Sequence, residues 1–423
     1  MKKYFKLLSC FALIFVMLFS FIACDNTTEE IPEDKGPGFK IEREKYFYGV
    51  GEMFSGTVDA AQTSEMTINL SSAMGMQSFR IWMHKTSVLQ KSNSNEITVR
   101  NAIETYKGYV NSLISAGVTN IIAMSHYYLY PTGFSGGGLG VFPTPDSSYY
   151  SSFMEMVEES YYVLVQEFPQ IKYWECGNEV NEHKYMQKPG GAAYTLKEKA
   201  QITTDLMYYA SRGIKRANPD AVAVMPGLVF SNNVSSGIVA FLNHIYTNIK
   251  SGDFPSTGIE SSTDPNDYFD VLNWHPYNFS GDSSEGSSFD KLNKMAYKVA
   301  QDNGDDGKKV FFTEYGYTTT QQSGLSREQL EERQGDYIAQ DMQNIWNNLP
   351  FVETVIIFRL FDWEQAGAAT GNPNSIEIGF GLFTSPNNGD IRPKEIGIKL
   401  FKQINGQDAD LSPIYQYDTT WQA

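Results

Sequence analysis

Residues 172–179 read KYWECGNE, and residues 309–316 read KVFFTEYG. Each stretch is a short apolar and aromatic run, typical of a buried strand, with a glutamate near its C-terminal end. Longer segments in which apolar residues recur at helical spacing lie on either side of both stretches. The two stretches are therefore predicted to be strands of one domain in which strands and helices alternate.

The same alternation runs along the chain from about residue 46 to residue 405. Eight strands are predicted, at Phe47–Glu52, Gln77–Met83, Asn120–Ser125, Lys172–Asn178, Ala221–Leu228, Tyr268–His275, Lys309–Tyr315 and Thr354–Leu360. Helical faces are predicted over 153–168 and 196–214, after a capping box at Ser326, and from Arg392-Pro393 onward. Eight such units favour an α/β fold of the (β/α)8 TIM barrel type, and no Gly-rich phosphate loop follows the first strand.

Composition narrows the class of protein. The 423 residues are 41% hydrophobic and 14% aromatic, which excludes a disordered, collagenous or coiled-coil chain. A formal net charge of −16 argues against an electrostatic nucleic-acid binder. Three cysteines cannot build a disulfide scaffold. We therefore expect one large domain over residues 46–410 and a C-terminal tail over 411–423.

The N-terminus has the pattern of an export signal. Three lysines precede an almost wholly apolar run that ends in Phe21-Ile22-Ala23-Cys24. This ending resembles a bacterial lipobox, although Phe21 stands where Leu is usual. The resemblance implies a signal peptide over 1–23, a lipid on Cys24, and export to the cell surface or the periplasmic face of a bacterial membrane. Plain secretion and an uncleaved anchor are the alternatives.

Residues 24–45 are predicted to be the lipidated cysteine and a flexible tether, because they are polar, acidic and contain Pro and Gly. Loss of residues 1–23 removes three lysines and no acids, which leaves a formal net charge of −19. Farther along, the long loops follow strands, at 127–146, 181–194 and 361–391, whereas the connections from helix back to strand look short. This asymmetry places the elaborated loops on the face where barrel active sites lie.

Two glutamates stand at strand ends, where a carboxylate is either solvated, paired or functional. Trp174-x-x-x-Asn178-Glu179 resembles the strand-four motif of clan A glycoside hydrolases, and Phe312-Thr313-Glu314-Tyr315-Gly316 resembles the strand-seven nucleophile motif of that clan. The chain is similar to families 5 and 39. The resemblance implies a retaining glycosidase that cleaves β-linked glycans by double displacement, with Glu179 as acid/base and Glu314 as nucleophile.

The same resemblance assigns roles to further residues. Arg80 would hydrogen-bond the nucleophile, Asn178 would bind the sugar 2-hydroxyl, and His275 and Tyr277 would contact the nucleophile and the substrate. Trp363 would be a stacking platform for a sugar ring. His126 is a further substrate-binding candidate, and Trp82 and His84 are site candidates. For all three the alternative is a place in the core or at the rim of the barrel. Glu175 is predicted to make an interior hydrogen bond instead of taking part in catalysis.

The sequence predicts no metal site and no cofactor. The five histidines have no HxxxH or HxH spacing, no Gly-x-Ser-x-Gly elbow is present, and Cys176 has no evident base partner. We expect a monomer whose partner is a neutral β-linked oligo- or polysaccharide, without nucleic acid and with membrane contact only through the lipid. Cellulase- or mannanase-like and β-xylosidase-like exo activities both fit, and a non-catalytic carbohydrate-binding surface lipoprotein is the rival interpretation.

Overall fold

The structure is a computed structural model that describes residues 43–52, 60–125, 128–230, 237–252, 259–320, 324–363, 375–386 and 391–421, with the backbone alone for 60–63. The predicted signal peptide, the lipidation site Cys24, the tether up to residue 42 and the candidate His126 lie outside the described residues. No helix in the described part of the chain is long and apolar enough to cross a membrane.

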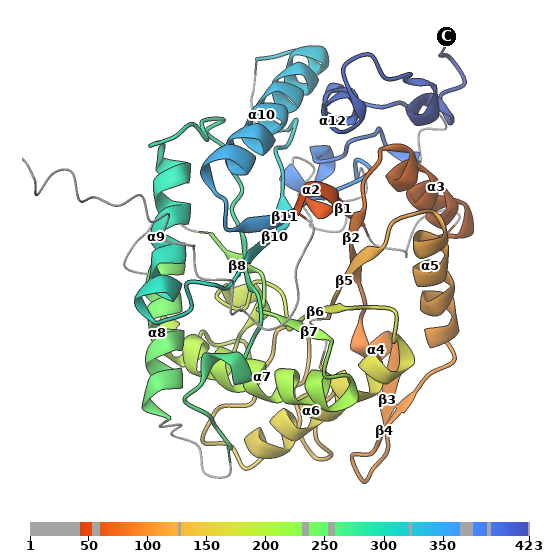
Figure 1. The fold of residues 1–423 in the computed structure, drawn as a ribbon. Helices are drawn as coiled ribbons and strands as arrows, with labels where there is room; N and C mark the ends of the chain where they lie inside the picture. Colours follow the sequence, from red (N-terminus) through yellow and green to blue (C-terminus); the bar gives the residue numbers. More distant parts are fainter. Residues whose placement is uncertain are drawn as a thin grey trace, which may run out of the picture. The chain divides into compact units, whose positions relative to one another are not determined.

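One parallel sheet forms the centre of the fold (Figure 1), in the strand order β7-β6-β5-β2-β1-β11-β10-β9-β8. The strands are β1 Tyr48–Glu52, β2 Ser78–Trp82, β5 Asn120–Met124, β6 Tyr173–Glu175, β7 Val222–Val224, β8 Leu228–Val229, β9 Leu272–His275, β10 Val310–Tyr315 and β11 Val352–Phe358. A separate antiparallel hairpin pairs β3 Leu89–Lys91 with β4 Ile97–Val99.

The sheet closes into a barrel because β7 and β8 are two halves of one strand. β7 pairs with β6, and β8 pairs with β9. Between the halves, the Met225 N–H donates to Val271 O (2.9 Å) and Gly227 O accepts from the Glu179 N–H (2.7 Å), so the ladder continues on both sides. Counting the two halves as one gives the eight strands of a (β/α)8 barrel, which confirms the predicted fold class.

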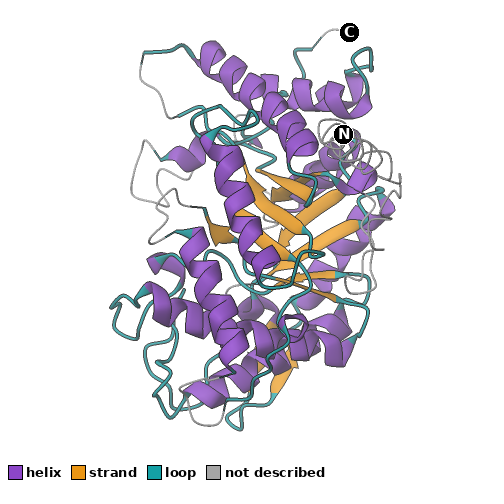
Figure 2. Cartoon of the chain, turned by 60° about the vertical axis from the view of Figure 1, so that its left-hand side comes forward, coloured by secondary structure: helices purple, strands orange, loops and turns teal. Residues whose placement is uncertain are grey.

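Helices lie outside the strands (Figure 2) and connect successive strands. The longer ones are α3 Ala60–Ala73, α5 Ile103–Ser115, α6 Tyr150–Glu167, α7 Leu196–Ala217, α8 Ile238–Ser251, α9 Ser288–Asp302, α10 Arg327–Asn348 and α12 Glu395–Asn405. Short ones are α2 Arg43–Tyr46 and α4 Lys85–Val88, with 3-10 turns η1 His183–Tyr185, η2 Pro265–Asp267, η3 Ile376–Gly379 and η5 Ser412–Tyr415. The predicted capping box at Ser326 is confirmed, since its hydroxyl accepts from the Gln329 N–H.

Several boundaries differ from the predictions for physical reasons. The sixth barrel strand begins at Leu272 and not at Tyr268, because Pro265–Asp267 form η2 and the Phe269 N–H bonds back to Pro265 O. The last helix begins at Glu395 and not at Arg392, because Lys394 is extended and its N–H donates to Leu382 O. The connection from α8 to β9, residues 252–271, is long, contrary to the expected shortness. The predicted limits of the signal peptide, the tether, the large domain and the C-terminal tail stay predictions.

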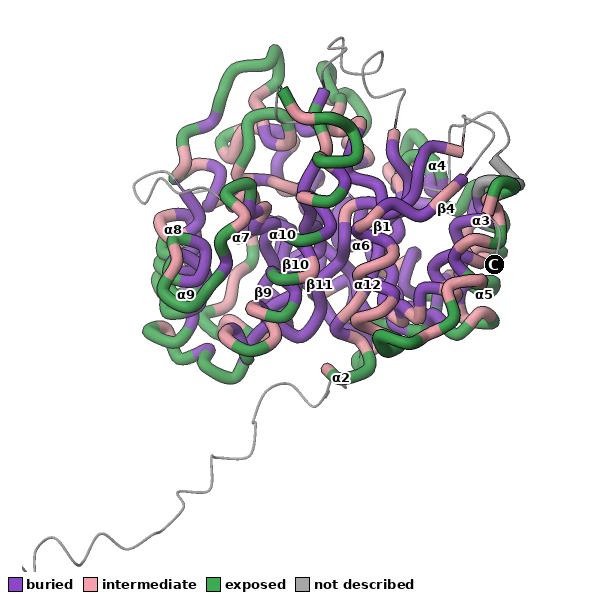
Figure 3. Tube along the Cα trace, turned by 90° about the horizontal axis from the view of Figure 1, so that it is seen from above, coloured by how far each residue is buried: buried purple, intermediate pink, exposed green. Residues whose placement is uncertain are grey.

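The barrel interior is polar toward the C-terminal ends of the strands and apolar beneath this polar layer. Alternate strand residues fill the lower interior: Ile122, Tyr173, Val222, Val224, Val271, Phe311 and Ile356 form one buried cluster. The opposite faces of the strands pack against the helices, and in Figure 3 exposed segments lie around a buried centre. Toward the C-terminal strand ends, the interior is taken over by buried Arg80, Glu175, Asn273 and Thr313. The fold therefore supports a polar site on an apolar base.

Lys85 is an uncompensated buried cation beside the barrel. Its ammonium lies over the rings of Tyr161 (3.7 Å) and Tyr128 (4.9 Å), and it finds no hydrogen-bond partner among the described residues. Burial lowers the pKa of Lys85 to about 7, which the nearby Cys176 opposes only partly. The folded state holds this proton less tightly than the unfolded chain does. Below pH 7 the charged Lys85 therefore lowers the free energy of unfolding by its full amount, and this cost disappears as the pH rises toward 10.5.

We therefore expect Lys85→Met to stabilise the protein, most strongly at pH 6 and least at pH 10. The shift from 10.5 to about 7 sets an upper limit of about 5 kcal/mol on the gain. Thermal unfolding across this pH range measures it. Lys298→Met, at an exposed ion pair with Asp302, is the control and should show no such pH-dependent gain. A lower melting temperature for Lys85→Met at pH 6 would contradict the argument.

Candidate active site

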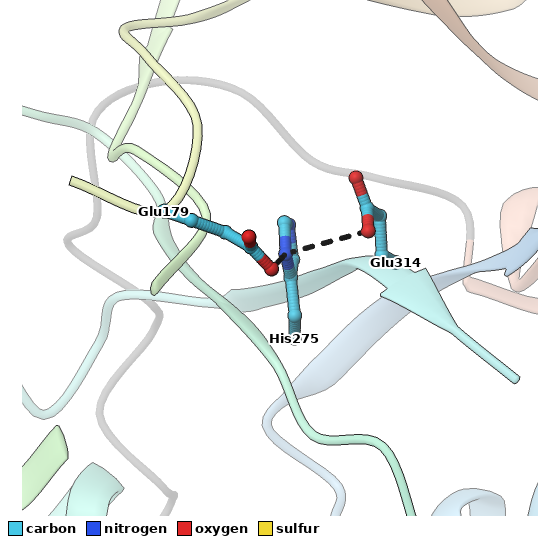
Figure 4. A group of neighbouring side chains, drawn as sticks. All are labelled: Glu179, His275 and Glu314. Atoms are coloured by element: carbon cyan, nitrogen blue, oxygen red, sulfur yellow. Dashed lines mark hydrogen bonds and ion pairs between the residues drawn. The ribbon is translucent and has the colours of Figure 1, made fainter. Parts of the chain in front are cut away.

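Two carboxylates and one imidazole meet at the C-terminal ends of the barrel strands, a region called the mouth below (Figure 4). Glu179 follows β6, Glu314 lies in β10, and His275 ends β9. His275 Nδ1 lies 3.1 Å from Glu179 Oε1 and 3.7 Å from Glu314 Oε2. One oxygen of each carboxylate and the Nδ1 atom all lie within 4.8 Å of one another. The structure thus brings together the two glutamates that the sequence motifs single out.

Glu179 reaches the mouth through an unusual backbone. Its φ of 48° is in the left-handed region, and Gly177 two residues earlier has a φ of 135°. The turn is held because the Glu179 N–H donates to Gly227 O and Asn178 bridges to Gly227. A non-glycine residue in this conformation costs about 1–3 kcal/mol, and such strain gathers at functional sites. The strained backbone at Glu179 therefore indicates that the position of its carboxylate serves a function.

Glu314 is aimed by an irregularity in β10. The register between β10 and β11 shifts between Phe312 and Tyr315, as in a β-bulge. The shift lets Thr313 turn into the polar interior, where its hydroxyl bonds Glu175 and Asn273, while Glu314 reaches Arg80 and Tyr277 at the mouth. A regular strand would send these two neighbours to opposite faces.

Arg80, the buried middle residue of β2, connects three of the site residues. Its Nε and Nη2 donate to the two Glu175 oxygens (2.7 and 2.8 Å), Nη2 also donates to Asn178 Oδ1 (2.7 Å), and Nη1 donates to Glu314 Oε1. Burial alone would lower the pKa of Arg80, but the charges of Glu175 and Glu314 outweigh it and raise that pKa. The predicted contact of Arg80 with Glu314 and the interior bond of Glu175 are both confirmed.

Glu314 is held in its ionised form. Burial by itself would raise its pKa, but the charges of His275 and Arg80 and the hydrogen bonds from Tyr277 and Arg80 together lower the pKa below its ordinary value. The Tyr277 hydroxyl donates to Glu314 Oε2 at 2.8 Å. In turn, burial and then the charge of Glu314 raise the pKa of Tyr277 well above its ordinary value, so the phenol stays a donor.

His275 Nδ1 and Glu179 Oε1 lie within hydrogen-bonding distance, at 3.1 Å. The Thr313 hydroxyl proton goes to Glu175 or Asn273, both of which present oxygen acceptors, so Thr313 Oγ1 accepts from His275 Nε2 (3.0 Å). If the imidazole is neutral, Nδ1 is then an acceptor that suits a protonated Glu179. If the imidazole is charged, Nδ1–H donates to an ionised Glu179. In each of these two states the hydrogen bond carries one proton between Nδ1 and Oε1.

The other candidates lie around this centre. Asn178 is buried against Arg80. Trp363 is half-buried, with its ring 5.1 Å from the Arg359 guanidinium, which itself pairs with Glu52. Trp82 lies 5.4 Å from the Arg80 guanidinium, and His84 is half-buried after β2. Whether these residues contact substrate stays a prediction.

Sequence reasoning missed an aromatic group next to Tyr277. The Tyr277 ring is stacked on exposed Phe279 (5.8 Å between ring centroids) and meets Phe358 (6.5 Å) and Phe380 (5.6 Å) edge-on. Phe358 ends β11 and is half-buried, so it is a second candidate sugar platform beside Trp363. The signal was present in the sequence as an aromatic at the end of strand eight, but only the fold brings it beside Tyr277.

Glu179, His275 and Glu314 could also hold a cation, since their ligand atoms lie within 4.8 Å of one another. Both Glu314 oxygens already accept hydrogen bonds, from Arg80 and from Tyr277, and the guanidinium adds a positive charge that disfavours a metal ion at this place. The absence of a metal requirement stays a prediction.

A (β/α)8 barrel with paired glutamates after its fourth and in its seventh strand has the layout of a clan A glycoside hydrolase. The family model "Cellulase (glycosyl hydrolase family 5)" matches residues 44–349. The chain therefore belongs to glycosyl hydrolase family 5 and is a glycosidase. No curated protein matches the sequence.

Solved structures show the same fold. A family 39 glycoside hydrolase from Bacteroides cellulosilyticus WH2 has a TM-score of 0.58 at 17% identity, covering 87% of this chain and 65% of the other, so this chain spans about two thirds of that protein. A double mutant of the β-glucosidase from Trichoderma harzianum has a TM-score of 0.57 at 13% identity, covering 86% and 98%. The family 1 β-glucosidase from Thermotoga maritima has a TM-score of 0.56 at 12% identity, covering 88% and 100%.

The strain at Glu179 can be measured. We expect Glu179→Gly to unfold at a higher temperature than Glu179→Ala, by about 1 kcal/mol in stability, because glycine alone adopts a φ of 48° without steric cost. Both variants lack the carboxylate, so the comparison isolates the backbone. Chemical denaturation with a common slope gives the difference. Equal stability of the two variants would show that the backbone at this position is not strained.

Proposed function

We propose that the protein is a retaining glycosidase that hydrolyses β-linked neutral glycans by double displacement. Glu314 is the nucleophile and Glu179 the acid/base. The observation that carries this proposal is the approach of their carboxylate oxygens to within 4.8 Å. Retaining enzymes place the two carboxyl groups about 5–5.5 Å apart, whereas inverting enzymes need about 6.5–9.5 Å to admit a water molecule.

The surroundings support the two roles. Arg80 and Tyr277 keep Glu314 ionised and hold both of its oxygens, so it can attack an anomeric carbon. The proton shared by Glu179 and His275 is available for the leaving oxygen. Once Glu314 is esterified, its negative charge is gone, and Glu179 with His275 can take the proton of the attacking water. Asn178, fixed by Arg80, would bind the sugar 2-hydroxyl.

A neutral β-glycan suits the charge and the aromatic rings of the mouth. The predicted mature chain carries −19, which repels polyanionic glycans. The family description supports a cellulase-like substrate, and mannanase-like action remains within the same proposal. The structural neighbours include β-glucosidases, so an exo-acting enzyme, of which a β-xylosidase type is one form, is the second candidate.

The test is a panel of 4-nitrophenyl β-glycosides and β-linked polysaccharides, with product size and anomeric configuration followed by NMR. We expect cleavage with net retention, and a loss of at least about 1,000-fold in kcat/KM for Glu314→Ala. For a substrate with an activated leaving group, azide should rescue Glu179→Ala by forming the β-glycosyl azide.

Three results would contradict this proposal, each in a different way. Inverted product would exclude double displacement, and full activity of Glu314→Ala would exclude it as nucleophile. Glycan binding without cleavage of any substrate by the wild type would establish the rival, a carbohydrate-binding lipoprotein.

Tyr277→Phe should change the pH dependence. The lost hydrogen bond stabilises ionised Glu314, so its removal raises the pKa of Glu314, and activity is lost at higher pH on the acid side. We expect the acid limb of the kcat/KM profile to move up by about one pH unit, with the fold intact. An unshifted acid limb would show that Tyr277 does not act on Glu314 in this way.

We further propose export and lipid anchoring through Cys24, on the lipobox-like ending of the leader. Metabolic labelling with a tritiated fatty acid tests this. The wild type should take up label, and Cys24→Ala should take up none while keeping glycosidase activity. An unlabelled wild type in a host that labels other lipoproteins would contradict the anchor.

A further inference from the structure

A third carboxylate, that of Glu377 in the segment after β11, lies close enough to Glu314 and Glu179 for their charges to act on it. Glu377 lies on η3, a single 3-10 turn whose backbone is held from four directions. The Thr318 hydroxyl donates to Ile376 O (2.7 Å), and the Trp363 N–H donates to Ile378 O (3.0 Å). Gly379 O accepts from the Gln334 amide (3.0 Å) and the Lys394 ammonium (3.2 Å). These hydrogen bonds hold the backbone from which the Glu377 side chain extends.

The turn is fastened next to the nucleophile. Phe380, the residue after η3, packs its ring on Tyr277 (5.6 Å), the same residue that donates to Glu314. Tyr185, on η1 after strand four, lies within the electrostatic reach of Glu179, Glu314 and Glu377 together. The loops after β6 and β11 therefore bring Tyr185 and Glu377 close to Glu179 and Glu314.

The Glu377 carboxylate is half-buried and accepts no hydrogen bond and no ion pair within the described part of the chain. Burial is the largest cause of its raised pKa, followed by the negative charge of Glu314, with Glu179 adding to it and Arg359 and Lys184 opposing. Arg359 does not pair with it, because that guanidinium is taken by Glu52. An unpartnered carboxylate in such a place costs free energy unless a ligand supplies donors.

We propose that Glu377 is a specificity-determining residue that binds hydroxyl groups of the substrate sugar and rejects sugars that carry a carboxylate at the same place. An ionised carboxylate only accepts hydrogen bonds, and its two oxygens match two neighbouring hydroxyl donors. A uronate would instead place a further carboxylate beside those of Glu314 and Glu377, and the charges would repel. This inference rests on the proposed glycosidase function and narrows its substrate to sugars with free hydroxyls at this position.

The role of Glu377 is tested by turnover. Glu377→Gln keeps the size of the side chain, and Glu332→Gln, at an exposed position on α10, is the control for loss of one charge. With the 4-nitrophenyl β-glycoside that the wild type cleaves best, we expect Glu377→Gln to lose about 10-fold or more in kcat/KM, mainly through KM. The ratio of this activity to that on the 4-nitrophenyl β-glucuronide should fall as well. Values within twofold of the wild type for both quantities would overturn the inference.

Binding separates this inference from the reaction itself. In the Glu179→Gln background, calorimetry compares cellotetraose with the same tetramer oxidised to carboxylates at C6. We expect cellotetraose to bind about 10-fold more weakly when Glu377→Gln is added, and the preference over the oxidised tetramer to shrink. If the wild type cleaves nothing but this binding difference appears, the glycosidase proposal fails and the role of Glu377 stands. If the wild type cleaves its substrate well and Glu377→Gln changes neither binding nor turnover, the proposed role of Glu377 is wrong and the glycosidase proposal stands.

Discussion

The site depends on the burial of Arg80 between Glu175 and Glu314. A guanidinium at 0% exposure is expensive to desolvate, and the two carboxylates together with Asn178 offset that cost. The same contacts fix Glu314 in space, keep it ionised and orient the amide of Asn178. Removal of any one member would leave a buried charge or donor without its partner, so stability and the geometry of the site are coupled through one side chain.

The barrel and the meeting of Glu179 with Glu314 could be predicted from the sequence. Strands showed as short apolar runs, and the two motifs placed Glu179 and Glu314 at strand ends that a barrel brings together. The contact of Arg80 with Glu314 followed from the resemblance. The predicted start of the sixth strand at Tyr268 was wrong because the apolar run looks like strand, whereas η2 and the local bond from Phe269 N–H to Pro265 O delay the strand to Leu272.

What the sequence could not supply are features that arise from register and close approach. The shift in β10 that lets both Thr313 and Glu314 turn inward depends on pairing with β11. The hairpin of β3 and β4 was not among the predicted strands. The hydrogen bond between His275 and Glu179 depends on the acceptors of the Thr313 hydroxyl, Glu175 on β6 and Asn273 on β9, which come from two strands other than its own. No local pattern encodes such a meeting.

The divided fifth strand, β7 and β8, has a further consequence. Gly227 lies in the gap, where its carbonyl fixes the backbone of Glu179, and a Cβ there would come within 2.1 Å of His275 Nε2. The positions of Glu179 and His275 thus both depend on a residue that has no side chain. Any side chain at position 227 would push the imidazole away from its place beside Glu179, so the gap in strand five tolerates glycine alone.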